Sequence, residues 1–152
     1  MTEKINIRPA TQNDYFFGYF VRKETMKEYI EKTYGWDTKI QKENHRKYYH
    51  RTMQGKYIIE LDSKKIGLLW YEEEMDYIEI NQIFILPKYQ KRGIGSTILT
   101  EIINTGKNKK KSIILGVLKS NINAQRLYNK LGFIEYDQND TEIKLKIEKI
   151  RI

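Results

Sequence analysis

The middle of the chain most limits what it can fold into, because three strand-like segments follow one another there without a helix. Lys56–Leu61 and Ile66–Glu72 are rich in β-branched and aromatic residues, and the polar stretch Asp62–Lys65 between them predicts a hairpin turn. Asp76–Leu86 predicts a third strand, which ends before Pro87 because proline lacks the N–H that a strand needs. The pattern predicts a sheet, with helices before and after these strands.

The remaining segments complete the order of elements. Further strands are expected over Ile5–Pro9, Ile113–Leu118, Phe133–Tyr136 and Glu142–Ile147. Helices are expected over Tyr15–Lys32 and Asp37–His50, from Gly95 to Gly106, and over Ala124–Lys130. The order β-α-α-β-β-β-α-β-α-β-β predicts an α+β fold with a single mixed, mostly antiparallel sheet flanked by helices. All 152 residues are expected to form a single domain, since no Pro-, Gly- or Ser-rich linker divides them.

The composition excludes several classes of protein. The chain has no cysteine, which excludes disulfides, thiolate metal sites and a cysteine nucleophile. No apolar run approaches the ~20 residues that cross a bilayer. Met1–Ile5 lacks the basic head and apolar stretch of a secretory signal. We therefore expect a soluble, cytoplasmic protein that spans no membrane.

The charge balance favours polyanionic partners. The chain has 28 basic and 20 acidic residues, a net charge of +8, which suits nucleic acid, a membrane surface or a phosphorylated cofactor. The dense run Lys107–Lys111 is interpreted as a solvated loop between two elements. Because no nucleic-acid recognition motif accompanies the charge, a basic nucleic-acid-binding module is kept as an alternative only.

A glycine-containing segment, Gln90–Ser96, lies between the third strand of the run and the next helix. Unpaired amides at a helix start and the helix dipole attract phosphate, and glycines let the backbone approach it closely. A dinucleotide fingerprint would need a glycine in place of Ile98, and a Walker A loop would need a lysine after Gly95. The segment therefore predicts a pyrophosphate site of another kind.

A second motif follows the next strand. The two motifs, in chain order, are Gln90-x-x-Gly93-x-Gly95 and Asn121-x-x-Ala124-x-x-Leu127-Tyr128-x-x-x-Gly132-Phe133. Together they resemble the two signature segments of GNAT-type N-acetyltransferases, over roughly residues 79–133. The resemblance implies transfer of an acetyl group from acetyl-CoA to a primary amine, by direct attack in a ternary complex.

The resemblance also implies which residues hold the co-substrate. The backbone groups of Ile83, Phe84 and Ile85 match those that pair with the pantetheine arm. The pyrophosphate cradle corresponds to the amides of Lys91, Arg92, Gly93, Ile94, Gly95 and Ser96. Asn121 matches the asparagine that contacts the cofactor arm, and Tyr128 matches the tyrosine near the thioester sulfur.

The chemistry needs a base and an acid, since an amine of pKa ~10 must lose a proton and the leaving thiolate must gain one. Tyr128 is the candidate acid, although it could instead pack its helix on the sheet. Some relatives carry a glutamate where this chain has Gly116, and others carry one near Glu79, which is the candidate base. Glu79 could also be a surface charge, with Gln82 orienting a water that relays the proton. Glu72–Glu74 are interpreted as solvated charges.

The acceptor site is expected near the first two helices, because the resemblance places it there. Tyr29, Trp36 and Tyr49 are candidates for lining it, whereas Tyr15, Phe16, Phe17, Tyr19 and Phe20 are expected in the core. His45 and His50 are five residues apart, which does not place them on one helix face, so no metal site is predicted.

Several acceptors are compatible with the sequence: a polyamine, an antibiotic amine, a protein N-terminus or a lysine side chain. The partner is therefore expected to be a small-molecule or peptide amine. Related proteins are often dimers, so a homodimer is compatible as well. A domain that binds acyl-CoA without transferring the acyl group is the second alternative, because Gly116 replaces a glutamate.

Overall fold

A computed structural model describes residues 4–150, and their elements follow the predicted order. The strands are β1 (Ile5–Pro9), β2 (Lys56–Leu61), β3 (Lys64–Glu73), β4 (Tyr77–Ile85), β5 (Ser112–Leu118), β6 (Ile134–Gln138) and β7 (Glu142–Ile147). The helices are α1 (Tyr15–Tyr34), α2 (Thr38–Tyr48), α3 (Ile94–Asn108) and α4 (Ile122–Lys130), with short 3-10 turns η1 (Gln12–Asp14), η2 (His50–Thr52) and η3 (Pro87–Tyr89). Residues 1–3, on which the expectation about a secretory signal rests, lie outside the described residues.

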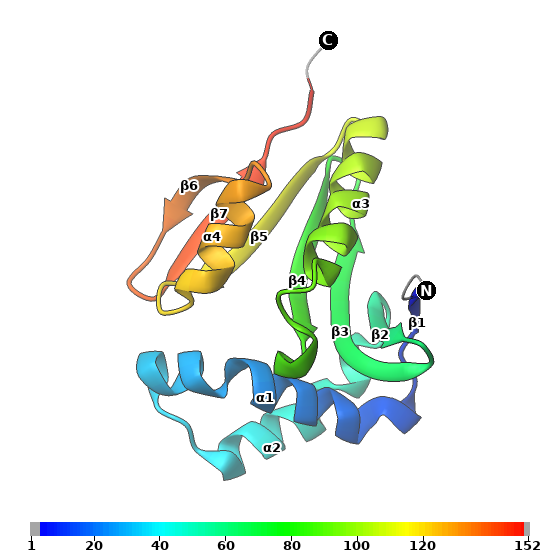
Figure 1. Cartoon of the computed structure of the whole chain (residues 1–152). Helices are drawn as coiled ribbons and strands as arrows, with labels where there is room; N and C mark the ends of the chain where they lie inside the picture. The colour runs from blue at the N-terminus through cyan, green and yellow to red at the C-terminus, as the bar shows by residue number, and fades with distance from the viewer. Residues whose placement is uncertain (1–3, 151–152) are drawn as a thin grey trace. The chain divides into compact units, whose positions relative to one another are not determined.

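The strands form one sheet with the order β1-β2-β3-β4-β5-β7-β6 (Figure 1). β4 and β5 run parallel, and their paired residues extend from Tyr77 and Ser112 to Ile80 and Leu115. The pairs β1–β2, β2–β3, β5–β7 and β6–β7 are antiparallel. The predicted α+β class with a mixed, mostly antiparallel sheet is confirmed.

The residues group into two compact units, each described here by itself. The first unit contains the residues up to Trp70 together with Gln82–Arg92, and the second contains Tyr71–Asn81 and the residues from Gly93 onward. That the chain acts as one domain stays a prediction. No helix among residues 4–150 is long and apolar enough to cross a membrane.

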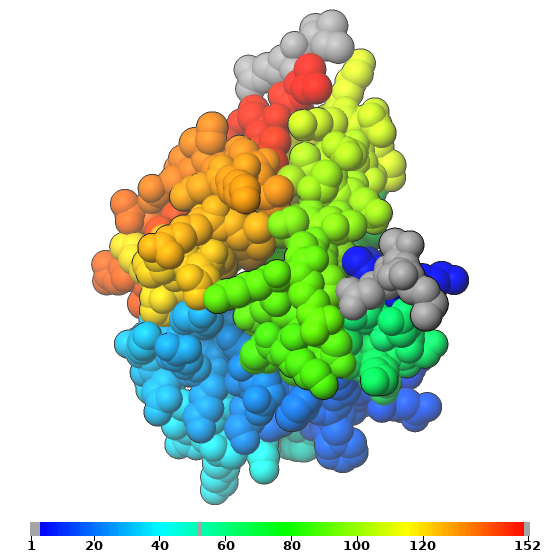
Figure 2. All heavy atoms as spheres, in the orientation of Figure 1, coloured from blue at the N-terminus to red at the C-terminus, as the bar shows by residue number. Residues whose placement is uncertain are grey.

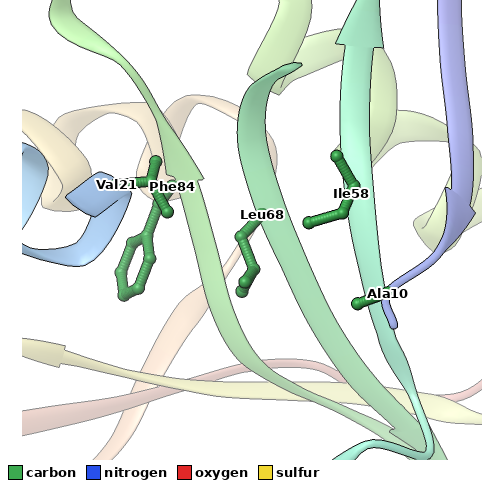
Figure 3. Packing of buried hydrophobic residues seen from close by; sticks show 5 residues of the cluster. All are labelled: Ala10, Val21, Ile58, Leu68 and Phe84. Carbon is green, nitrogen blue, oxygen red and sulfur yellow. The ribbon is translucent and has the colours of Figure 1, made fainter. Parts of the chain in front are cut away.

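The core of the first unit joins α1 to neighbouring strands. Val21 of α1 packs with Ala10, Ile58, Leu68 and Phe84, and Figure 3 shows the last three side chains on β2, β3 and β4. These side chains are at most 8% exposed. Their burial, worth about 1.5–3 kcal/mol for each large side chain, holds α1 on this sheet face.

The core of the second unit confirms the predicted apolar face of α3. Ile98, Leu99, Ile102 and Ile103 are all buried. A Cβ atom on Gly106 would lie 2.3 Å from Cδ1 of Ile113, so α3 and β5 approach too closely there for a side chain.

Glu72–Glu74 and Lys107–Lys110 are exposed, which confirms the predicted solvation of the acidic turn and of most of the lysine run, whereas Lys111 is half-buried. Nζ of Lys109 and Nζ of Lys111 form ion pairs with Glu73 at 2.9 Å and 3.0 Å, and Lys111 also donates to the carbonyl oxygen of Glu74. The run continues from the last turn of α3, which brings its lysines beside the end of β3. These ion pairs therefore join the segment after α3 to the end of β3 within the second unit.

The aromatic residues at the start of α1 are also not all core. Phe16 is 81% exposed and Phe20 is 47% exposed, whereas Tyr15, Phe17 and Tyr19 are half-buried. Successive helical residues point about 100° apart, so five aromatics in six positions cannot share one buried face. The exposed surface of α1 is visible in blue in Figure 2.

Candidate functional site

The loop before α3 has the backbone geometry of an anion site. Lys91 and Gly93 both adopt left-handed conformations, with φ of 62° and 82°, and Gly93 precedes the helix without any side-chain cap. The amide of Thr97 donates to the carbonyl oxygen of Gly93, which leaves the earlier amides of the helix without an intrahelical acceptor. These amides and the positive end of the helix dipole favour an anion.

Space at this loop fits a bulky anion. A Cβ atom on Gly93 or on Gly95 would meet no other atom within 4 Å, so both glycines border open space. Lys91 and Arg92 are exposed, and the Arg92 guanidinium lies 5.3 Å from the centre of the Tyr89 ring. The loop can therefore receive a pyrophosphate on its backbone and add basic side chains around it.

The strand before the loop is tied to it by a side chain. Nε2 of Gln90 donates to the carbonyl oxygen of Ile85 over 2.7 Å. The Phe84 side chain is buried in the core, whereas Ile83 and Ile85 are half-buried. A Cβ atom on Gly67 would lie 2.2 Å from the carbonyl oxygen of Phe84, so only glycine fits beside this strand. The glutamine of the first motif thus fixes where β4 ends and the loop begins.

Asn121 has a structural role in the second unit. Its Oδ1 accepts a hydrogen bond from the amide of Ala124 over 3.1 Å, which caps α4. Nε2 of Gln125 donates to the carbonyl oxygens of Leu118 and Lys119, and so holds α4 to the end of β5. The cap explains why the helix begins at Ile122, two residues before the predicted start.

Tyr128 of α4 is 9% exposed, and its ring meets Phe133 edge to face at 5.8 Å between centroids. Burial raises the pKa of the Tyr128 phenol to about 12. The hydroxyl therefore keeps its proton at neutral pH and can donate a hydrogen bond.

A carboxylate lies over Gly116, although this residue has no side chain. A Cβ atom on Gly116 would lie 1.9 Å from Oε1 of Glu142, so the Glu142 side chain from β7 occupies that space. The β5–β7 register pairs Leu118 with Glu142, which places Glu142 one step along the same sheet face. Sequence reasoning missed Glu142; the signal was a glycine inside an apolar strand, which often marks a close approach. Glu79 itself is half-buried on β4, opposite Ile114.

The aromatic candidates of the first unit have structural partners. Tyr49 is 2% exposed and its hydroxyl donates to the carbonyl oxygen of Thr11 over 2.7 Å. Nε1 of Trp36 donates to Oγ1 of Thr38, and Tyr29 is half-buried in α1.

The two histidines lie beside one tyrosine, which their spacing did not predict. The ring centroids of His45 and His50 are 4.6 Å and 5.7 Å from that of Tyr15. The chain leaves α2 for the 3-10 turn η2 at His50, and this change of helix type alters the direction of the side chain. Across residues 4–150, no group of three His, Cys, Asp or Glu side chains is placed to hold a metal ion.

The predicted site residues divide between the units. Of the co-substrate residues, the first unit contains Ile83, Phe84, Ile85, Lys91 and Arg92. The second unit contains Gly93, Ile94, Gly95, Ser96, Asn121 and Tyr128, and also Glu79.

Comparison with known proteins finds similar sequences and similar folds. An uncharacterized N-acetyltransferase of Methanocaldococcus jannaschii is 30% identical over 93 residues, which cover 56% of this chain and 41% of the length of that protein. The PaiA N-acetyltransferase of Thermoplasma acidophilum, solved in complex with coenzyme A, is 20% identical, with a TM-score of 0.78 over 97% of this chain and 99% of its own. Arabidopsis thaliana Naa50, solved with the bisubstrate analogue CoA-Ac-MVNAL, is 14% identical, with a TM-score of 0.69 over 95% of this chain and 98% of its own.

These solved structures share the fold of this chain. The sequence match to a family extends over residues 18–133, which include both motifs, the loop before α3 and Tyr128. The chain belongs to the Acetyltransferase (GNAT) family.

Proposed function

We propose that the chain is an N-acetyltransferase domain that transfers the acetyl group of acetyl-CoA to a primary amine. The observation that carries the proposal is the loop of Lys91–Ser96, where left-handed turns, uncapped amides and open space at two glycines meet at the start of α3. Family membership and the coenzyme A bound by a solved relative support it.

In this proposal the loop amides from Lys91 to Ser96 bind the pyrophosphate. The backbone groups of Ile83–Ile85 pair with the pantetheine arm. The described pairing of β4 with β5 ends at Ile80, so β5 does not use the backbone groups of Ile83–Ile85, and this supports the assignment. The side-chain Nδ2 of Asn121 contacts the same arm, because Oδ1 of that side chain already accepts the hydrogen bond that caps α4.

The reaction forms a bond between the amine nitrogen and the acetyl carbon and breaks the bond from that carbon to sulfur. The ammonium gives up one proton before the attack, and the nitrogen loses a second proton as the amide forms. The sulfur leaves as a thiolate, which that second proton then neutralises. Tyr128, protonated at neutral pH, donates a hydrogen bond to that sulfur. Its pKa of about 12 makes it a poor source of a free proton, so we assign it stabilisation of the leaving group.

Glu79 is the proposed base. It lies on β4 and is half-buried, and it takes the ammonium proton directly or through a water held by Gln82. Glu142 is a second carboxylate of the same unit, and its position over Gly116 supports it as the alternative base.

One kinetic assay tests both assignments. Tyr128→Phe is expected to lower kcat about tenfold to a hundredfold with little change in acetyl-CoA affinity, because a hydrogen bond to a charged atom is lost while the ring still packs on Phe133. Glu79→Gln is expected to lower kcat, because it removes the group that takes the proton, and Glu142→Gln is expected to leave kcat near the wild-type value. Unchanged turnover in Tyr128→Phe would contradict its role, and the reverse result for the glutamates would make Glu142 the base.

The proposed function itself is tested by thermal unfolding with and without acetyl-CoA, with ATP as the control polyphosphate. A ligand at a hundred times its Kd adds about 2.7 kcal/mol to the free energy of unfolding. For a domain of this size we therefore expect a rise in Tm of about 5–10 °C. Equal shifts with ATP would reduce the loop to a general anion site. No shift with either ligand would contradict the proposal and favour the nucleic-acid alternative.

The acceptor is proposed to be a small-molecule or peptide amine. Acetyl-CoA binding without turnover on any amine would favour the domain that binds without transferring. A cytoplasmic location and a homodimer remain predictions from the sequence.

A further inference from the structure

Lys56, the first residue of β2, is a buried cation without a carboxylate partner. It is 8% exposed, and among residues 4–150 no carboxylate forms an ion pair with it. Its Nζ lies 4.9 Å from the ring centre of Trp70 and 5.1 Å from that of Tyr49. Burial lowers the pKa of Lys56, because the charged ammonium is less favourable in these apolar surroundings than in water.

A second cation without a carboxylate lies nearby. The Arg22 guanidinium donates to the amide oxygen of Gln41, and burial lowers its pKa. The pKa of His45 is lowered chiefly by burial and further by the charges of Lys56 and Arg22. The His45 ring lies 5.0 Å from that of Tyr49, over which Nζ of Lys56 is placed at 5.1 Å. It also lies 5.7 Å from the ring of Tyr19, which is one turn of α1 before Arg22. Nε2 of His45 donates to the carbonyl oxygen of Tyr15, and the neutral imidazole does not compensate the two charges.

Two buried polar atoms beside these cations have no hydrogen-bond partner among the described residues: Nε1 of Trp70 and the hydroxyl of Tyr19. Trp70 is paired with Lys56 in the β2–β3 register. The Tyr19 ring lies 5.7 Å from that of His45. We call Tyr19, Arg22, Lys56 and Trp70 the donor cluster; all four belong to the first unit.

Buried donors and charges are costly unless an acceptor satisfies them. The donor cluster offers two cations and an indole N–H, and its one possible acceptor is a hydroxyl. A compact anion with several oxygen acceptors would satisfy it. The phosphates of acetyl-CoA are assigned to the loop before α3, so the anion belongs to the other substrate.

We propose that the donor cluster binds the carboxylate of the acceptor, and that the acceptor class is a small amine carrying a carboxylate, such as an α-amino acid. The inference rests on the proposed acetyltransferase function, since it names the substrate of that reaction. It predicts that an amino acid is preferred over the amine formed from it by decarboxylation.

Binding is tested without activity by the fluorescence of Trp70. The chain has two tryptophans, Trp36 and Trp70, so the wild-type signal is compared with that of Lys56→Met, and the part of the change lost in the variant is assigned to Trp70. The protein is titrated with the twenty standard amino acids, with the amine formed by decarboxylation of each amino acid that gives a change, and with inorganic phosphate. We expect a saturable change with at least one amino acid and none with its amine. No change with any amino acid, equal changes with the amines, or a change with phosphate alone would overturn the proposal.

The matched variants are Lys56→Met and Lys47→Met. Lys47 also lies over a ring, 5.3 Å from the centre of Tyr48, but it is exposed. Lys56→Met should abolish the fluorescence change and lower kcat/KM for the amino acid about tenfold or more, through KM, since a charged hydrogen bond is lost. Its Tm should be unchanged or higher, because a buried charge is replaced by a flexible apolar side chain. Lys47→Met should behave like the wild type.

A purely structural Lys56 would give a different result: a lower Tm and an equal loss of rate with all amines. The change in Tm on adding acetyl-CoA distinguishes failure of this inference from failure of the proposed function. A normal shift with no preference for carboxylate-bearing amines overturns this inference alone. Loss of the shift in the wild type overturns the proposed function.

Discussion

Replacing Asp14 with asparagine is expected to lower the free energy of unfolding by about 2–3 kcal/mol, because it removes the charge of a buried carboxylate that binds two partly exposed cations. The Asp14 side chain is 1% exposed and accepts two hydrogen bonds from the Arg8 guanidinium, both at 3.0 Å. Its Oδ1 also lies 2.7 Å from Nζ of Lys65, and the amide of Thr11 donates to its Oδ2. An asparagine keeps the shape but faces two cations with no charge. Chemical denaturation should show a lower midpoint at an unchanged m-value.

The same carboxylate predicts a dependence on pH. Burial by itself raises the pKa of Asp14, but the hydrogen bonds from Arg8, Lys65 and Thr11 outweigh it and hold the pKa well below its ordinary value. A group with a depressed pKa in the folded state stabilises the protein above its unfolded pKa and loses this contribution as pH falls. The difference in stability between wild type and Asp14→Asn should therefore be constant near neutral pH and shrink below pH ~4.

Glu43→Gln is the matched control for Asp14. Glu43 pairs with Arg46, but both side chains are exposed, at 58% and 69%, so its replacement should change stability little. Equal effects of the two substitutions would show that the Asp14 pair contributes no more than a surface pair.

The order of elements could be predicted because it depends on local pattern. Lys56–Leu61 and Glu142–Ile147 agree with the sequence at both ends, since turn residues flank each strand. The pairing of Asp14 with Arg8 and Lys65 could not be predicted, because it brings β1, η1 and β3 together and polar residues near a helix start are expected to cap it. The prediction that the aromatic residues of α1 all lie in the core failed for a related reason. Their hydrophobicity does not indicate which face of the helix packs against the sheet.

In the candidate site, too, some residues could be predicted from the sequence and others could not. The loop of Gly93 and the positions of Asn121 and Tyr128 follow from motifs, because backbone conformation and helix starts are encoded within a few residues. Glu142 and Lys56 belong to no motif. Glu142 lies over Gly116 because of how β7 pairs with β5. Lys56 is buried beside the rings of Tyr49, which follows α2, and Trp70 of β3. Such juxtapositions depend on strand pairing and packing, which the sequence pattern leaves open.

The other large expected effect concerns Gly93. Gly93→Asp should weaken binding of coenzyme A about a hundredfold, because like charges about 4 Å apart near a protein surface repel by about 4 kcal/mol before salt screening. A side chain here meets no atom within 4 Å, and a negative charge at a helix start is favourable for the helix. The variant should therefore stay folded while it loses the ligand.

Gly93→Asn separates the charge from the backbone conformation. The φ of 82° at Gly93 is left-handed, and asparagine tolerates this region better than most residues and has the size of aspartate. Calorimetric titration with coenzyme A should give a Kd within a few-fold of wild type for Gly93→Asn and a far weaker one for Gly93→Asp, with similar Tm values for both. The gap between the two variants should narrow at high salt, as expected for repulsion between charges. If the two variants bind coenzyme A equally well, the pyrophosphate does not lie at this helix start, and the basis of the proposed function is lost even though the fold and family remain.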